Sequence, residues 1–573
     1  MGLDGRRSSA HPIRIRRCSS ASRPRGSQEL SIEHLVDVDP SIDSFSPSAP
    51  LPTEPIKRPR TKFGSPFRMV SLNRPEFTAK PSSKEDTIGV TQTFPLDHLI
   101  TVLDDLLPLG HKKKEEIHHL PPHSQESFRT SFSHLMGDNY IDLIVKDSLK
   151  LLPSSLQDQI IKAYVAYVHP FLPVLNLPSF LGDIMTGNVT CFSSPLLYQA
   201  VMLAGSAFIE DSDVHIAGYL TRRDLREVLY ERAKVLFEFG TENNAHVQVQ
   251  SLLLMTLWHD HKGGHKTPSY WLDLAYTTAE KVKRGPGCLS LEDRIWWCVY
   301  LRDRIISLTF RRRPRIQDSA SEISVLGSAS PVYESYPSAV LDKLGETACM
   351  LTRDGQEQMA ALFSQIVKLA HCLGIVIECL WHGTWITGLH GQTVHTLELV
   401  TNMSPIVVSR CEQLLNNWFH SLPHSARYSF SGTAFQSNTM ALTAHKASLH
   451  LLYLTVTSIT YRTGAAMDHF TSALYLEKMR LTTYQIKKTL TELLDTRLLL
   501  LLPDVAIATL LSFLECSRSE LRGPDAGVRL QAMINIYTCE QAAVQLLQTY
   551  PSAQLILLAA SDARADLLGL TET

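Results

Sequence analysis

Three histidines follow one another closely between Trp258 and His265, in the run WHDHKGGH. Imidazoles at this spacing can bind zinc or copper, so His259, His261 and His265 form the most metal-like cluster of the chain. The adjacent Gly-Gly pair supports a second interpretation, because a flexible loop after a buried helix also collects polar residues. We therefore expect a solvated loop here and predict no metal ligand.

The ten cysteines lie too far apart to form a zinc cluster. No pair has the C-x-x-C spacing that brings two thiolates to one metal ion, and Cys18 is the only cysteine before Cys191. A disulfide-stapled secreted scaffold is excluded as well, since the chain is long and poor in cysteine. The sequence predicts no cofactor for this chain, with zinc expected only if a missing N-terminal segment carries a cysteine cluster.

Motifs of the common enzyme classes are missing. The run Ala204-Gly205-Ser206-Ala207 lacks the second glycine of a nucleophile elbow, and the chain has neither an H-E-x-x-H motif nor a P-loop. Helical prenyl and terpene synthases need an aspartate-rich helix for magnesium, whereas Asp104-Asp105 is followed by two leucines and a proline. We predict that the protein is not an enzyme and has no catalytic residues.

A basic run consists of Lys57, Arg58, Arg60 and Lys62. Residues 1–80 hold fourteen Lys and Arg against eight Asp and Glu, although the whole chain has a net charge of -2. Such a run on an exposed segment is typical of a nuclear localisation signal and can contact phosphates without sequence specificity. The alternative is an ordinary solvated tail.

The elements that must position these residues are helices. The 573 residues are 44% hydrophobic and 20% charged, which predicts globular packing in the body of the chain. Residues 1–92 are rich in Pro, Ser and Arg without periodicity and predict a disordered tail. Beyond them apolar residues recur at helical steps, as in the run from Thr221 to Gly240, and strand alternation with hairpin turns is missing. The predicted fold class is all-α, an irregular multi-helix domain with a disordered N-terminal tail.

The longest apolar stretch, Leu498 to Leu514, is interrupted by Pro503 and Asp504. It falls short of the roughly 20 residues that span a bilayer. We interpret it as two core helix segments that meet at the proline, and we predict no membrane segment.

A series of motifs runs from residue 160 to residue 316. It begins in IIKAYVAYVHPFLPVLNLPSFL and continues through VQSLLLMTLW to RIWWCVYLRDR and RPRI. In this order the motifs resemble the fungal-specific transcription factor domain, the regulatory middle region of fungal zinc-cluster activators. HPFLPVL and WWCVYLRDR are similar to the branch of cutinase transcription factors. The positions that carry the resemblance include His169, Pro170, Pro173, Trp296, Trp297, Arg302, Asp303, Arg304, Arg313 and Pro314.

These positions also have a structural interpretation, which we favour over direct contact with a ligand or partner. Trp296 and Trp297 offer two large apolar faces, each of which can pack against a neighbouring helix. The run from Arg302 to Arg304 can make charge-assisted hydrogen bonds that fix its helix against the Arg313-Pro314 loop.

Three departures from the family pattern affect the expected function. Arg312 replaces the glycine that precedes Arg313-Pro314 in the family, and the segment after the Trp271 helix is shortened, which weakens the expectation of small-molecule sensing. Family members also bind DNA through six closely spaced cysteines that hold two zinc ions. Because this chain has no such cluster, we expect no autonomous sequence-specific DNA binding.

The resemblance implies a nuclear regulator of RNA polymerase II transcription in a fungus, acting on a metabolic or secondary-metabolite gene set. It would reach promoter DNA indirectly or through a DNA-binding exon missing from the gene model, with other transcription factors, co-regulators, or a homo- or heterodimer as partners. The predicted domains are the tail 1–92, the N-terminal part of the regulatory domain at 93–330 and its C-terminal helical continuation at 331–573. The rival hypothesis is a helical protein-interaction scaffold without a transcriptional role.

Overall fold

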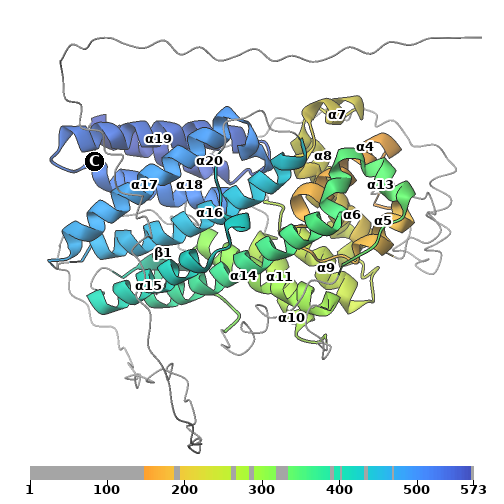
Figure 1. Cartoon of the computed structure of the whole chain (residues 1–573), viewed down its shortest axis with the longest axis horizontal. Helices are drawn as coiled ribbons and strands as arrows, with labels where there is room; N and C mark the ends of the chain where they lie inside the picture. Colours follow the sequence, from red (N-terminus) through yellow and green to blue (C-terminus); the bar gives the residue numbers. More distant parts are fainter. Residues whose placement is uncertain are drawn as a thin grey trace, which may run out of the picture. The chain divides into compact units, whose positions relative to one another are not determined.

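The computed structural model describes residues 148–185, 194–259, 266–282, 290–317, 333–387, 393–400, 403–430, 437–467 and 470–568. The predicted tail 1–92 and its basic run lie outside these residues. All described residues belong to one compact unit within Val90–Thr573, and they are almost entirely helical, which confirms the predicted all-α class (Figure 1).

Short and medium helices make up the first part of the described chain. They are α4 (Ser154–Ala163) with its π-helical continuation η2 (Tyr164–Val168), α5 (Leu177–Met185), α6 (Pro195–Gly205), the 3-10 turn η4 (Ser206–Phe208), α7 (Asp211–Ile216), α8 (Arg222–Glu238), α9 (Ala245–Met255), α10 (Pro268–Ala279) and α11 (Leu291–Thr309).

Longer helices dominate the second part. They are α13 (Ser338–Leu344), η5 (Gly345–Leu351), α14 (Arg353–Leu380), α15 (Pro405–Ser421), η6 (His424–Ala426), α16 (Ser437–Ala465), α17 (Ser472–Asp495), η7 (Leu498–Leu501), α18 (Val505–Leu521), α19 (Ala526–Leu546) and α20 (Ala553–Leu568). The apolar stretch at 498–514 thus forms η7 and the start of α18 on either side of Pro503, as predicted.

Local sequence explains where the helices begin and end. In α8 the recurring residues Leu225, Leu229 and Ala233 are all buried, as their spacing predicts. The helix is followed by Gly240, whose φ of 63° is easily reached only by a residue without a Cβ. At the start of α11, Ser290 and Asp293 form a reciprocal capping box.

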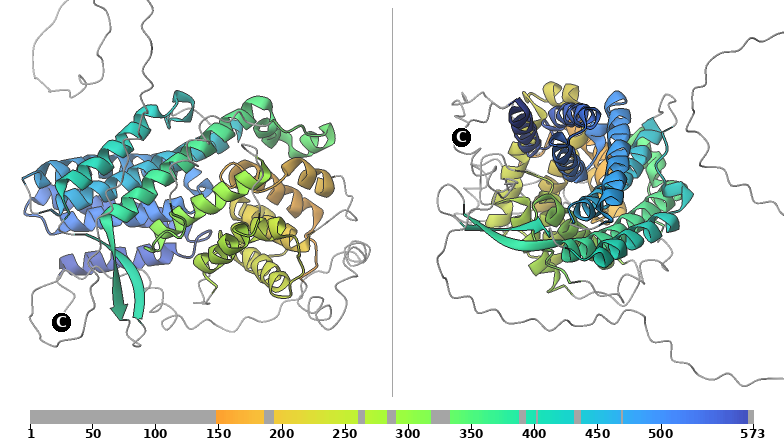
Figure 2. Two further views of the ribbon diagram at one scale, coloured as in Figure 1. Left: turned by 90° about the horizontal axis from the view of Figure 1, so that it is seen from below. Right: turned by 90° about the vertical axis from the view of Figure 1, so that its left-hand side faces the viewer.

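A hairpin of two strands departs from the sequence prediction. The strands β1 (Trp381–Thr387) and β2 (Thr393–Leu399) pair antiparallel, with Trp381 opposite Leu399. Their Thr, Val, Ile and Trp residues favour an extended backbone, and the intervening GLHGQ segment has two turn-forming glycines. The hairpin extends away from the helices in the left view of Figure 2. The expectation that hairpins are missing throughout was therefore wrong at this position.

The helices enclose two clusters of buried apolar side chains. The first draws on residues from Leu149 to Cys516, and therefore includes side chains on both sides of residue 330. The second draws on residues from Ala444 to Ala563. Helices α16 and α18 contribute to both, so the C-terminal helices pack directly on the rest of the described fold.

Among the described helices, α14 alone is long and apolar enough to cross a membrane by length and composition. Of its most apolar window, 67% is buried inside the fold, and the helix packs against α11, α15 and α16. This burial is the behaviour of a core helix.

Candidate functional site

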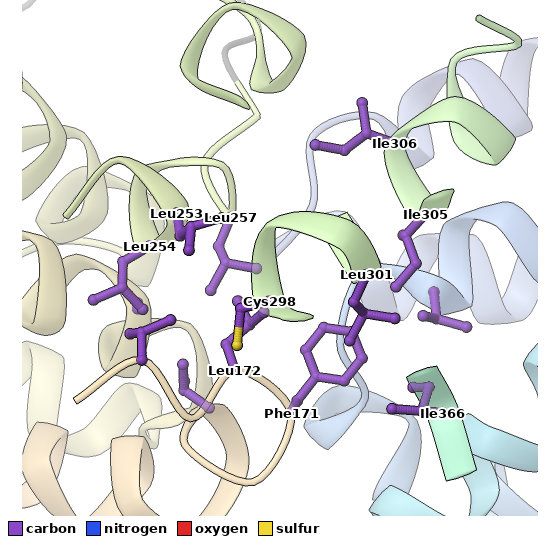
Figure 3. Packing of buried hydrophobic residues seen from close by; sticks show 14 of the residues in the cluster. Phe171, Leu172, Leu253, Leu254, Leu257, Cys298, Leu301, Ile305, Ile306 and Ile366 are labelled. Atoms are coloured by element: carbon purple, nitrogen blue, oxygen red, sulfur yellow. The ribbon is translucent and has the colours of Figure 1, made fainter. Parts of the chain in front are cut away.

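Helix α11 passes through the first apolar cluster and carries the motif residues Arg302, Asp303 and Arg304. Figure 3 shows Cys298 of this helix beside Leu172 and Leu257, and Leu301 beside Phe171. From Trp297 to Thr309 every side chain of the helix is buried, including the three charged ones. Buried charges require partners, since an isolated charge is costly to remove from water.

Arg302 connects α11 with segments far away in sequence. Its Nε donates to Thr256 Oγ1 over 2.9 Å, and one terminal nitrogen donates to the Thr256 carbonyl over 3.1 Å. The other terminal nitrogen donates to Asp504 Oδ1 over 2.8 Å, across 202 residues of sequence. Arg302 is fully buried and Asp504 is 2% exposed, so this ion pair is shielded from solvent.

His259 extends the network to the C-terminal helices. Its Nε2 lies 3.6 Å from Asp504 Oδ2, and its Nδ1 lies 3.0 Å from Ser552 Oγ, between α19 and α20. Burial alone would raise the pKa of Asp504, but the neighbouring Arg302 and His259 hold it well below its usual range. The carboxylate is therefore ionised in the folded chain at neutral pH.

Arg226 on α8 makes a parallel connection. It donates to the Thr549 carbonyl and, over 3.0 Å, to the Leu257 carbonyl. Its guanidinium also lies 5.3 Å from the centre of the Trp258 ring, within the range of a cation–π contact. We call Arg226, Thr256, His259, Arg302 and Asp504 the polar hub. It connects α8, α9 and α11 with the turn before α18.

Asp303 and Arg304 hold the loop after α11. The Asp303 carboxylate accepts hydrogen bonds from the backbone N–H groups of Arg315 and Ile316 at 2.9 and 3.1 Å. Arg304 donates to Asp303 over 2.7 Å and to the Ile316 carbonyl over 2.7 Å. Arg312 adds an ion pair to Asp303 at 3.3 Å. The predicted attachment of this loop to α11 is thus made mainly through its backbone.

The two tryptophans of α11 lie in different surroundings. Trp297 is buried and meets Tyr300 edge-on, at 5.6 Å between ring centres. Trp296 is partly buried, and its ring centre lies 6.4 Å from that of Tyr276 on α10. Beyond α11, the Arg313 side chain is exposed and Pro314 is partly buried.

The HPFLPV segment lies at the end of η2. Pro170 and Pro173 are buried, and the Val174 carbonyl accepts a 2.6 Å hydrogen bond from Gln250 on α9. The Nδ1 atom of His169 is buried, and burial lowers the pKa of this histidine to about 3. Val168 and Phe171 of this stretch line a small cavity together with the hub residue Arg226, so the segment packs beside the polar hub.

Arg302 is the one residue of the polar hub that the sequence identified as a site residue. Arg226 and Thr256 were not considered, and the other two were misjudged. His259 was assigned to a solvated loop, yet its side chain is 4% exposed, so that assignment was wrong for this residue. Asp504 was noted only as an interruption of an apolar run. A single carboxylate inside such a run is itself a signal, because a charge buried there must be paired. His261 and His265 lie outside the described residues. Among the residues that the structure describes, no group of three or more His, Cys, Asp or Glu side chains could hold a metal ion.

A pocket of about 380 Å³ is lined by residues of α4, η2, η4, α7, η5 and α16. Tyr167, Phe208 and Met350 contribute apolar surface, while Glu210 and Asp213 are among the acidic residues that line it. The volume lies within the range of small-molecule sites. Lys162 lines it as well, so the pocket offers groups of both charges beside its apolar surface.

Cys379 on α14 and Cys411 on α15 interact where these helices pack together. The hydrogen bond from Cys411 lowers the pKa of the Cys379 thiol to about 7, although partial burial opposes this shift. The same interaction and burial raise the pKa of Cys411. Burial also raises the pKa of the Cys298, Cys349, Cys516 and Cys539 thiols.

We expect Cys379 to be alkylated about tenfold faster at pH 7 than the half-buried Cys349, because the thiolate is the reacting form. Limited labelling of the native chain with iodoacetamide, followed by peptide mass spectrometry, measures both rates. Cys411→Ala should slow the labelling of Cys379 because it removes the hydrogen-bond donor. Faster labelling of Cys349, or an unchanged rate in Cys411→Ala, would contradict this prediction.

Comparison with known proteins shows which family part of this chain matches. Residues 161–420 match the family model described as the fungal specific transcription factor domain. This span includes the early motif residues, α11 and the loop that Asp303 holds. The hub residue Asp504 lies outside it.

Curated relatives include three named transcription factors. Cutinase transcription factor 1 beta of Fusarium vanettenii is 27% identical over 442 residues, which cover 72% of this chain and 49% of the relative. Transcription factor cpaR of Aspergillus oryzae is 30% identical over 350 residues, which cover 57% of this chain and 56% of the relative. Fusaric acid cluster transcription factor FUB12 of Fusarium oxysporum f. sp. lycopersici is 25% identical over 272 residues, which cover 45% of this chain and 39% of the relative. The matched part spans about half the length of the first of these relatives, and no solved structure matches the chain.

Proposed function

Because this chain carries the fungal specific transcription factor domain at residues 161–420, we propose that it regulates transcription by RNA polymerase II in the nucleus of a fungus. The names of its relatives, a cutinase factor and a fusaric acid cluster factor, support a metabolic or secondary-metabolite gene set as its target. The chain matches only about half of the first relative, so its route to promoter DNA is part of this proposal. It would bind through a partner, or through a cysteine cluster outside this sequence.

The polar hub is the observation that gives this proposal a structural basis. It joins Arg302, inside the matched span, to Asp504, which lies beyond it. Under this proposal, a ligand or partner that favours one arrangement of the early helices would act through this ion pair on the start of α18. Such coupling between distant segments is what a regulatory body needs.

A reporter experiment tests nuclear entry and regulatory activity together. The full chain is fused to a DNA-binding domain that lacks its own nuclear signal, beside a reporter that carries the cognate site. We expect a several-fold change in reporter output, and loss of that change when Lys57, Arg58, Arg60 and Lys62 are replaced by alanine. The changed chain should recover its effect when a foreign nuclear localisation signal is added.

The added signal also separates the two ways in which the experiment can fail. A fusion that enters the nucleus with the foreign signal but leaves the reporter unchanged would contradict a regulatory role and favour the interaction scaffold. A four-alanine variant that acts as strongly as the original sequence would instead exclude only the localisation role of the basic run. Glu357→Gln, at an exposed position on α14, serves as the matched control.

A further inference from the structure

Cys379 and Cys411 are two thiols in contact across a helix interface. Cys379 lies in the last turn of α14 and Cys411 in the first half of α15, and these two helices pack together. The thiol of Cys411 donates a hydrogen bond to the sulfur of Cys379, and both cysteines are free in this structure. A disulfide requires Cβ atoms about 4 Å apart. Two sulfurs already in contact on packed helices therefore need only a small movement to form one.

The two thiols differ in their access to solvent. The Cys379 side chain is partly exposed at the end of its helix, whereas Cys411 is 2% exposed and belongs to the first apolar cluster. A small oxidant therefore reaches Cys379 first, and the protected thiol of Cys411 lies next to it. This is the arrangement of an accessible, oxidation-sensitive cysteine beside a resolving cysteine.

The electrostatic surroundings also favour reaction at Cys379. The hydrogen bond from Cys411 lowers the pKa of Cys379 to about 7, although partial burial and the charge of Glu378 oppose the shift. About half of this thiol is therefore ionised at neutral pH, and the thiolate is the form that attacks an oxidant. Burial instead raises the pKa of Cys349, the other partly exposed cysteine among the described residues. Cys379 is thus the more reactive of the two.

We propose that Cys379 and Cys411 form a reversible oxidation site, which hydrogen peroxide converts from two thiols into an intramolecular disulfide. In the first step the Cys379 thiolate attacks one peroxide oxygen. A sulfur–oxygen bond forms and the oxygen–oxygen bond breaks, and the leaving hydroxide takes up the proton that Cys379 had released. The products are a sulfenic acid and water.

The second step joins the two helices. The Cys411 sulfur attacks the sulfur of the Cys379 sulfenic acid, so a sulfur–sulfur bond forms and the sulfur–oxygen bond breaks. The hydroxyl group leaves as water with the proton of Cys411. Both thiols are then oxidised and the peroxide is fully reduced to water. A thiol reductant reverses the modification by thiol–disulfide exchange.

The disulfide closes a loop that contains the whole β1–β2 hairpin. Strand β1 begins two residues after Cys379, and the Val400 N–H donates to the Leu380 carbonyl over 2.9 Å at the base of the hairpin. The Leu397 N–H donates to the Arg311 carbonyl, which attaches the hairpin to the loop after α11. Oxidation therefore restrains the base of the hairpin, together with the segment that connects it to the regulatory motif region.

Peptide mass spectrometry without reductant tests the proposal. The purified full chain is reduced, freed of reductant, treated with a small excess of hydrogen peroxide and then blocked with iodoacetamide. We expect a cross-linked peptide pair that contains Cys379 and Cys411 and that disappears on addition of dithiothreitol. Cys349→Ser is the matched control, since it removes the other partly exposed thiol, and it should form the same cross-link at the same rate.

Replacing one cysteine at a time separates the two steps. In Cys411→Ala the oxidation should stop at the Cys379 sulfenic acid, which dimedone traps. In Cys379→Ala the buried Cys411 should stay reduced, and circular dichroism checks that both reduced variants fold. If peroxide forms no disulfide in the original chain, or joins Cys379 to a different cysteine, the proposal is overturned. The result is read from the purified chain, so it does not depend on whether the chain regulates transcription.

Discussion

Replacing Arg302 by alanine is expected to destabilise the folded chain by about 3–5 kcal/mol, the cost of breaking a buried ion pair from one side. The substitution leaves Asp504 as a buried charge without its main partner and removes both hydrogen bonds to Thr256. We expect the urea midpoint to fall accordingly. Hydrogen exchange should become faster in α9, α11 and the start of α18, because Arg302 connects these three segments.

A double-mutant cycle separates the ion pair from the loss of side-chain volume. Arg302→Ala combined with Asp504→Ala should cost less than the sum of the two single changes, because the second change removes the unpaired charge left by the first. Arg313→Ala is the control, since this exposed arginine lies in the loop after the same helix. If Arg302→Ala lowers the unfolding free energy no more than Arg313→Ala does, the hub contributes little to stability.

The helices of the fold could be predicted because their signals are local. The apolar spacing in α8, the capping residues of α11 and the proline between η7 and α18 each lie within a few residues of the feature they determine. The motif run from Arg302 to Arg304 was recognisable for the same reason. Asp303 and Arg304 meet partners only 12 or 13 residues further along the chain.

The polar hub could not be derived in this way. Arg302 finds Asp504 across 202 residues, and Arg226 finds Thr549 across 323. A single sequence records the type of each residue but not which distant segments the fold brings together. Asp504 could have been recognised as a buried charge in need of a cation, whereas its choice of Arg302 among the chain's many basic residues depends on how the helices pack.

The hairpin β1–β2 illustrates a second limit. Its strands are seven residues each and lie between two long helices. In the sequence-based prediction the helical pattern on both sides was given more weight than these short stretches of β-branched residues. In the fold, Leu397 of β2 donates a 2.8 Å hydrogen bond to the carbonyl of Arg311. The hairpin is thus held in part by the loop that follows α11, a contact that the strand sequences do not encode.

Acidification below pH 6.5 is expected to destabilise the chain well before its carboxylates titrate. Burial lowers the pKa of His169 to about 3 and those of His445 and His450 to about 4. Between these values and 6.5 the unfolded chain binds protons that the folded chain does not, so stability falls as the pH falls. Each histidine should contribute a loss of about 2 kcal/mol at pH 5. Asp504 affects stability only at lower pH. Its depressed pKa stabilises the folded chain, and this contribution is lost only below about pH 4.

His445 provides the sharpest test of this acid sensitivity. It is 6% exposed, and its Nε2–H donates to the Ala166 carbonyl over 2.8 Å, so it links α16 to η2 in its neutral form. His445→Gln keeps a donor but cannot titrate, and should remove about a third of the stability loss between pH 7 and pH 5 in urea titrations. Asn417→Gln, at an exposed position on α15, is the control and should show the same change in unfolding free energy between pH 7 and pH 5 as the original chain. If the unfolding free energy is the same at pH 7 and pH 5, these histidines are not held neutral by burial.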